Sequence, residues 1–142
     1  MKIKEMLNES ITSKNSYEES VENIDILTEK MDDDFIPYRV EQNVMMWLNQ
    51  EGLLGEIECI FPTRLDEEVR LVKRANITVE TGFPLINTEE TMEVPEVKTF
   101  VGNEYFVLYF SELTEYDRMI VANDLSFYLE EEELIAIKAV IS

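Results

Sequence analysis

The chain has 142 residues, with 31 Asp or Glu against 12 Lys or Arg, and a formal net charge of −19 at pH 7. This length suits one domain with a real core, burying about two thirds of its unfolded surface. One cysteine and no histidine exclude an internal disulfide and remove the usual catalytic base and metal ligand. Because the first residues lack an apolar signal and no run approaches the roughly 20 apolar residues of a membrane span, we expect a cytoplasmic protein.

The charge bears on the partners of the protein more than on its fold, because a negative field repels anions and attracts cations. We therefore expect a basic protein as partner, and no binding to nucleic acid or membrane. Over a surface of about 7,600 Å², the excess charge amounts to about one per 400 Å², against about one per 100 Å² on duplex DNA. DNA mimicry would thus require carboxylates clustered on one face.

The first fifty residues predict helices, because apolar residues recur there at spacings of three and four. Pro37 suits the first turn of a further helix, which Gly52 would end, with Trp47 in the core. The apolar positions of these helices are Ile3, Met6, Leu7, Tyr17, Val21, Ile24, Leu27 and Met31, followed by Val40, Val44, Trp47 and Leu48.

Residues 56–129 predict an antiparallel sheet of about five strands. Around Cys59 apolar residues alternate with acidic ones, which indicates a strand and a buried, inert thiol. The clearest alternation covers residues 69–79, where Arg70 and Arg74 lie on the polar side and are expected to pair with the protein's own acids. Two hairpins are predicted where strand-like runs flank turn residues, at Gly102-Asn103 and at Asn123-Asp124.

Residues 81–96 show no clear period, and such long irregular segments are often functional. The segment carries apolar side chains, including Phe83 and Met92. We expect these side chains to pack back on the sheet; the alternative is that they are anchors for a partner.

The last residues, 130–141, predict a helix that carries Leu134, Ile137 and Ile141 on one stripe. Glu130 to Glu133 would suit its start, where the helix dipole favours negative charge. The predicted fold is therefore a single α+β domain over residues 1–142, with helices in 1–50, an antiparallel sheet in 56–129 and a C-terminal helix packed on one sheet face.

The sequence offers no recognisable catalytic set, and we expect neither an enzyme nor a bound cofactor. Triads that use histidine are excluded, and four scattered glycines do not build a phosphate loop. A zinc site is not expected with one sulfur ligand and no imidazole. Asp32, Asp33 and Asp34 lack the acid spacing and central glycine of a helix-loop-helix calcium site, so no metal site is expected either.

Charge and the missing catalytic set together favour a non-catalytic protein that covers a basic surface of another protein. In size and charge, though in no motif, the chain resembles toxin-immunity proteins and acidic inhibitors of DNA-binding enzymes from bacteria or phages. The partner would be a nuclease-type toxin or a nucleic-acid enzyme, approached by electrostatic steering. The candidate contact residues are Asp32, Asp33, Asp34, Glu89, Glu90 and Glu93, with Phe83 and Met92 as apolar anchors.

Two other classes stay open. The chain would be a structural or assembly subunit if its acidity served only solubility and apolar residues of 81–96 docked on a neighbouring copy. It would be a carboxylate- or divalent-metal-dependent hydrolase if two of its many acids worked as an acid and base pair, although no pair stands out.

Overall fold

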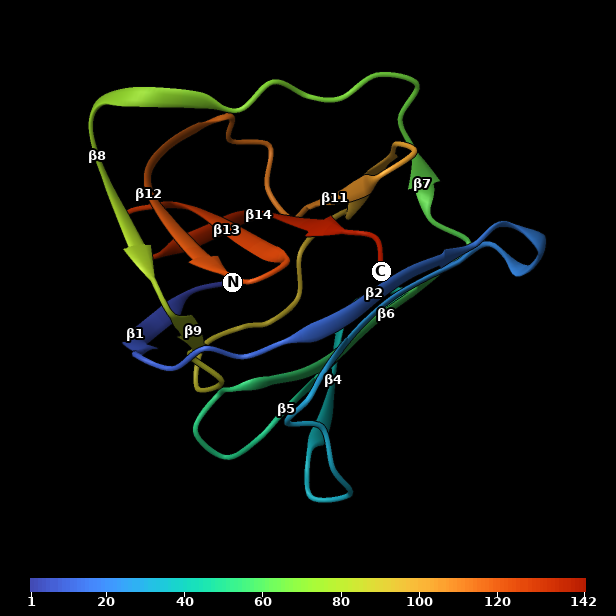
Figure 1. Ribbon diagram of the computed structural model, residues 1–142, viewed down its shortest axis with the longest axis horizontal. Coiled ribbons are helices and arrows are strands. Elements are labelled where there is room, and N and C mark those ends of the chain that lie inside the picture. Colours follow the sequence, from blue (N-terminus) through green and yellow to red (C-terminus); the bar gives the residue numbers. More distant parts are fainter.

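The computed structural model describes residues 1–142, and it consists of strands and loops with one 3-10 turn, η1 (Glu19–Val21). The strands form sheets of five, seven and two strands, and the two larger sheets stack as the layers of a sandwich (Figure 1). The predicted α+β fold is therefore wrong, and the protein is all-β.

The five-stranded sheet comes from one continuous part of the chain and is antiparallel throughout. Its inner face carries Ile24, Ile26, Ile57 and Cys59, which are buried, and its outward side chains alternate with them. In order across the sheet, its strands are β2 (Ser13–Glu18), β3 (Asn23–Thr28), β6 (Leu54–Ile60), β5 (Val44–Leu48) and β4 (Ile36–Glu41).

The seven-stranded sheet is mixed, because β7 pairs parallel to β10 and β8 pairs parallel to β12. In order across the sheet, its strands are β7 (Thr63–Arg64), β10 (Lys98–Val101), β11 (Tyr105–Tyr109), β14 (Glu133–Val140), β13 (Leu125–Glu130), β12 (Glu115–Ala122) and β8 (Val72–Thr81).

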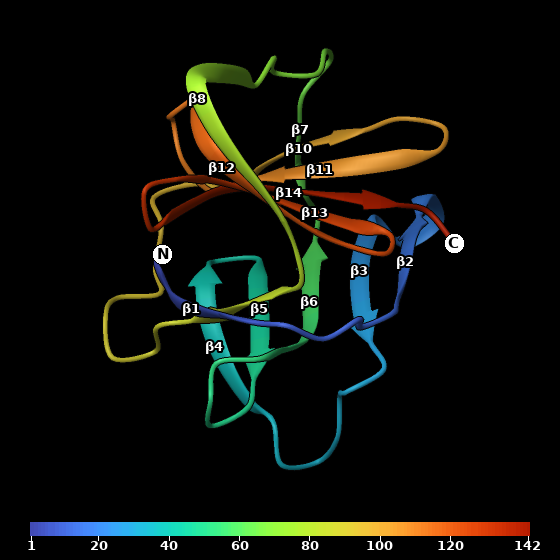
Figure 2. The ribbon, with the colours of Figure 1, turned by 60° about the vertical axis from the view of Figure 1, so that its left-hand side comes forward.

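A two-stranded sheet, β1 (Ile3–Leu7) with β9 (Phe83–Ile86), links the two larger sheets. The Ile3 amide donates to the Glu132 carbonyl in the β13–β14 turn, while Leu85 forms a bridge with Leu53 just before β6. Figure 2 shows β1 crossing the five-stranded sheet below the larger one. The pair thus covers part of the inner face of the smaller sheet.

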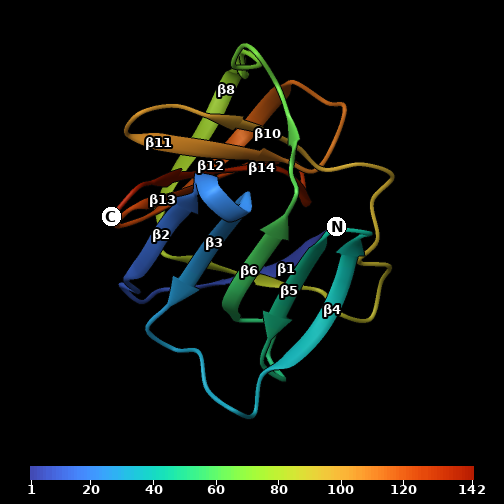
Figure 3. The ribbon, with the colours of Figure 1, turned by 90° about the vertical axis from the view of Figure 1, so that its right-hand side faces the viewer.

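The main core contains 29 buried residues drawn from all three sheets. Near its centre the rings of Phe83 and Phe127 meet edge to face, with centroids 5.2 Å apart. Behind the seven-stranded sheet the segment between β7 and β8 covers a smaller apolar cluster around Tyr109. The five-stranded sheet differs, because its outward side chains Leu27 and Ile60 are 37% and 39% exposed. Figure 3 shows this outer face toward the viewer, with β1 behind it.

The predicted N-terminal helices are replaced by β1 to β5 because apolar residues recur there with a period of two. In the expected helical stripe, Val21 and Leu27 are 60% and 37% exposed, whereas Ile26, outside the stripe, is fully buried. In β5 the buried residues Val44, Met46 and Leu48 alternate with Met45 and Trp47. Trp47 therefore lies on a strand, half-buried on the outer face.

The predicted C-terminal helix is the hairpin of β13 and β14. Glu131, with φ of 56°, makes the turn, so the four glutamates cover the end of β13, the turn and the start of β14. Leu134 to Ile137 are all buried because β14 is the middle strand of its sheet and has side chains packed on both faces. The helical stripe was a coincidence within a continuous apolar run.

Both predicted hairpins are confirmed, as β10 with β11 and β12 with β13. Asn123 has φ of 49°, the left-handed conformation that asparagine tolerates in tight turns. The strand predicted at residues 69–79 appears as β8, shifted toward the C-terminus and bulged between Lys73 and Thr78. No helix has the length and apolar character that crossing a membrane requires.

Candidate partner-binding surface

Two acidic loops, residues 29–35 and 49–53, lie at one end of the five-stranded sheet, and a third, residues 87–97, starts beside the second and runs along the edge strand β4. The first two line a common hollow of about 620 Å³, to which Asp32, Asp34 and Glu51 contribute. The amide of Ile86 donates to the Gly52 carbonyl at 2.9 Å, which brings the third loop beside the second. Figure 2 shows the first two loops below the sheet and the third at its side.

We call six exposed carboxylates on these loops the acidic rim: Asp32, Asp33, Asp34, Glu51, Glu89 and Glu90. The three loops contain a single basic residue, Lys30, and its Nζ lies 2.7 Å from Glu9 Oε1. The rim therefore has no free cation of its own.

Short side-chain hydrogen bonds order the loops of the acidic rim. The Asp34 amide donates to Asp32 Oδ1 at 2.8 Å, and the Glu89 amide donates to Asn87 Oδ1 at 3.0 Å. Asn49 Oδ1 accepts from the amides of Glu51 and Leu53. These turns fix the backbone that carries Asp34, Glu51 and Glu89, whose side chains are exposed.

Among the predicted contact residues, Asp32 to Asp34 lie at one end of the sheet, and Glu89 and Glu90 lie on the loop that starts beside Gly52 and runs along β4. Glu93 is also exposed but lies farther along, where the amide of Val94 donates to the Val40 carbonyl of β4. It lines a separate hollow of about 400 Å³ with Glu41 and Glu96.

The two predicted anchors lie in the core. Phe83 is 0% and Met92 is 7% exposed, so neither side chain is available on the surface of the folded protein. Leu85 and Ile86 are buried with them, which confirms the expectation that apolar residues of 81–96 pack back on the sheet. Phe83 and Met92 are therefore not part of the candidate partner-binding surface.

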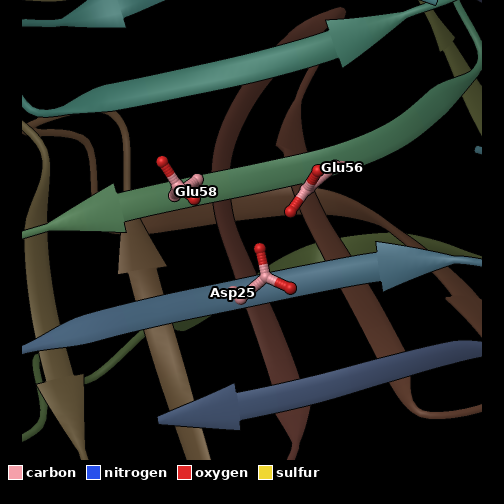
Figure 4. Close-up of side chains that lie close together, drawn as sticks. All are labelled: Asp25, Glu56 and Glu58. Carbon is pink, nitrogen blue, oxygen red and sulfur yellow. The ribbon is translucent and has the colours of Figure 1, made fainter. Parts of the chain in front are cut away.

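A second group of carboxylates, which the sequence prediction missed, lies on the outer face of the five-stranded sheet. Asp25 of β3 is directly opposite Glu58 of β6, and Glu56 lies two residues from Glu58 on the same face. Oxygens of the three groups lie within 4.8 Å of one another, and Figure 4 shows them gathered over the two strands. We call Asp25, Glu56 and Glu58 the carboxylate trio.

Asp25 is half-buried and has no cation beside it. Burial raises the pKa of Asp25 from its usual 3.8 to about 8, with further contributions from a hydrogen bond to Glu56 and from repulsion by Glu56 and Glu58. Asp25 therefore retains a proton near neutral pH. Carboxylate oxygens also suit hard cations, but calcium takes six to eight oxygen ligands, and three side chains on an open face supply only part of such a shell.

Apolar side chains surround the trio on this outer face. Leu27 and Trp47 lie on either side of Glu56, and Met45 is opposite Glu58. Ile60, 39% exposed, continues the same row of β6. The outer face therefore combines three carboxylates with uncovered apolar surface.

Two further predictions concern isolated residues. Cys59 is buried as predicted, and burial raises the pKa of its thiol to about 12. Arg74 pairs with the protein's own acids as expected, with Nη2 at 2.6 Å from Glu130 Oε1 and Nη1 at 3.3 Å from Glu115 Oε2. The same expectation fails for Arg70, which lies within 4.0 Å of no carboxylate.

Comparison with known proteins gives no family: no protein-family model matches the chain, and no curated protein matches its sequence. The function is therefore inferred from the surface chemistry, with the acidic rim as its main feature.

Proposed function

We propose that this protein is a non-catalytic cytoplasmic binding protein that covers a basic surface of another protein, as an inhibitor or immunity-type antagonist of a nuclease-type toxin or nucleic-acid enzyme. One observation carries the proposal. Six exposed carboxylates lie on three loops at one end and along the adjoining edge of a sheet, and the single lysine of these loops is already paired.

The physical role of such a rim is to steer association. A face of one charge sign attracts an oppositely charged partner during diffusion and raises the association rate by about 10- to 1,000-fold at low salt. The whole-chain charge of −19 extends this attraction. Because salt screens charges beyond about 10 Å at 0.1 M, the steering should weaken as ionic strength rises.

The assembly alternative receives less support. It depends on exposed apolar side chains in residues 81–96, yet Phe83, Leu85, Ile86 and Met92 are buried. A basic partner fits the exposed carboxylates of the same segment better.

The proposal is tested by identifying the partner and measuring how fast it associates. Affinity capture from host extract with mass spectrometry identifies candidates, and stopped-flow mixing of each purified pair gives the association rate at low and high salt. We expect the rate for a basic partner to fall at least about tenfold from low to high salt. The variant D32N/D33N/D34N should lose most of this salt dependence.

A matched control removes three charges at another site. Glu18, Glu19 and Glu22 are exposed at the β2–β3 connection, so E18Q/E19Q/E22Q changes the net charge equally and leaves the acidic rim intact. An association rate that is independent of salt, or equal losses in the two triple variants, would contradict the proposal.

A further inference from the structure

The outer face of the five-stranded sheet is continuous with the acidic rim. Leu27, Trp47 and Glu56 form the row of outward side chains next to the ends of β3, β5 and β6 from which the acidic loops depart. A partner drawn to the rim therefore meets this face next.

This face is chemically divided along its length. The carboxylate trio and Trp47 lie toward the rim, while the opposite end is apolar, with Ile60 39% and Phe61 62% exposed. Val21 of η1 is 60% exposed, and the Phe61 amide donates to the carbonyl of neighbouring Glu22 at 2.8 Å. Contiguous apolar surface bordered by charge is typical of protein interaction sites.

No basic side chain of the protein pairs with the carboxylate trio. None of its carboxylates lies within 4.0 Å of a lysine or arginine nitrogen. By register, Lys14 of β2 lies opposite Leu27, on the strand next to Asp25, and Arg39 of β4 lies opposite Met45, two strands from Glu58. Arg39 already donates to the Gln42 carbonyl at 2.9 Å.

We propose that the outer face of the five-stranded sheet is the docking face of the proposed interface, and that it receives a partner segment in which one arginine or lysine is flanked by apolar side chains. The basic head group lies among Asp25, Glu56 and Glu58, and its aliphatic stem lies against Leu27 and Trp47. This inference rests on the proposed function. In it the acidic rim raises the association rate of the partner, and contacts on the outer face slow its dissociation.

Known side-chain chemistry supports this division. Long basic side chains bury their methylene stems on apolar surface while the charge reaches polar groups. Arginine forms planar, bidentate hydrogen bonds with carboxylates and stacks on aromatic rings, and Trp47 lies directly opposite Glu56. Apolar neighbours exclude water around such a contact, which strengthens it.

The test uses a peptide probe and needs no knowledge of the partner. Acetyl-Leu-Arg-Leu-amide is titrated into isotope-labelled protein, and amide and Trp47 indole shifts are followed by NMR. Acetyl-Leu-citrulline-Leu-amide has nearly the same shape without the charge. We expect saturable shifts confined to β3, β5 and β6, with about tenfold weaker binding of the citrulline peptide.

Variants separate the face from general electrostatics. D25N/E58Q should weaken binding of the arginine peptide about tenfold. E131Q/E132Q removes at least as much charge from exposed positions in the β13–β14 turn, away from this face, and should leave binding unchanged. A well-dispersed spectrum for each variant shows that its fold is intact. Shifts scattered over the molecule, equal binding of the two peptides or equal loss in both variants would overturn the proposal.

Other outcomes are also informative. If magnesium, calcium or manganese alone shifts the trio and excludes the peptide, a cation site replaces the docking face. If the arginine peptide does not bind the outer face but the partner's association rate depends on the acidic rim, the docking inference is wrong and the proposed function stands. If the peptide binds but no salt-dependent partner exists, steering by the rim fails.

Discussion

Replacing Asp25 by asparagine should stabilise the protein above neutral pH and leave its stability at acidic pH nearly unchanged. In the folded protein the pKa of Asp25 is about 8, against a usual value of 3.8. Between these two pH values the folded state keeps a proton that the unfolded chain has lost. The free energy of unfolding therefore falls as pH rises through this range, and asparagine removes that fall because it does not ionise.

The magnitude follows from the size of the perturbation. A tenfold change in an ionisation constant is worth about 1.4 kcal/mol, so the difference between 3.8 and about 8 sets an upper bound near 6 kcal/mol. The trio lies on an open sheet face, where water screens the charges and the side chains reorient. We therefore expect a gain of about 2 kcal/mol for D25N at pH 9 and less than about 0.5 kcal/mol at pH 5.

Urea unfolding at the two pH values measures this difference, with fluorescence of the single tryptophan, Trp47, as one probe and circular dichroism as the second. E18Q removes one negative charge from an exposed position on the adjacent strand β2, so it reports the general effect of lowering the net charge. Equal stabilisation by D25N at pH 5 and pH 9, or an E18Q effect as large as that of D25N, would refute the reasoning.

Three further experiments test the fold itself. G52A should lower the free energy of unfolding by about 3 kcal/mol in thermal or urea unfolding, because φ is +89° and a Cβ would overlap the carbonyl of Ile86, the last residue of β9. G102A is the control: the atom nearest to its Cβ would lie at 3.3 Å, so it should cost under about 1 kcal/mol. N15A should cost about 1 to 3 kcal/mol, because the buried Asn15 amide donates to the Val140 carbonyl at 2.9 Å; no loss in urea unfolding would contradict this. The Cys59 thiol, with a pKa raised to about 12, should react with a disulfide reagent at pH 8 only as the protein unfolds, and fast reaction in native buffer would show that the thiol is accessible.

The sequence identified strands where polar and apolar residues alternate between clear turn signals. The turns at Gly102 and Asn123 were enough to define two hairpins. The hairpin containing β14 was missed because Leu134 to Ile137 form a continuous apolar run, and such a run fits a buried helix as well as a central strand.

The N-terminal error has a different cause. In residues 13–28 apolar side chains are sparse, and the chance spacing of Tyr17, Ile24 and Leu27 matches a helix, while burial follows Ile24 and Ile26. Once Asp25 was assigned to a helix, its position opposite Glu58 was not predictable. The acidic rim was partly predictable, because Asp32 to Asp34 and Glu89 to Glu90 are short acidic runs outside any clear period. Which strands they flank was not predictable, since loop 87–97 lies beside loop 49–53 only through the bond between Ile86 and Gly52.

The strand order has a consequence for synthesis of the chain on the ribosome. The five-stranded sheet needs residues 13–60 only, whereas β14, last in the chain, is the middle strand of the seven. The nascent polypeptide can therefore pair its early strands well before the layer that should cover them exists. Until then the apolar inner face of the five-stranded sheet is exposed to water. We therefore expect ribosome-associated chaperones to bind this partly folded chain.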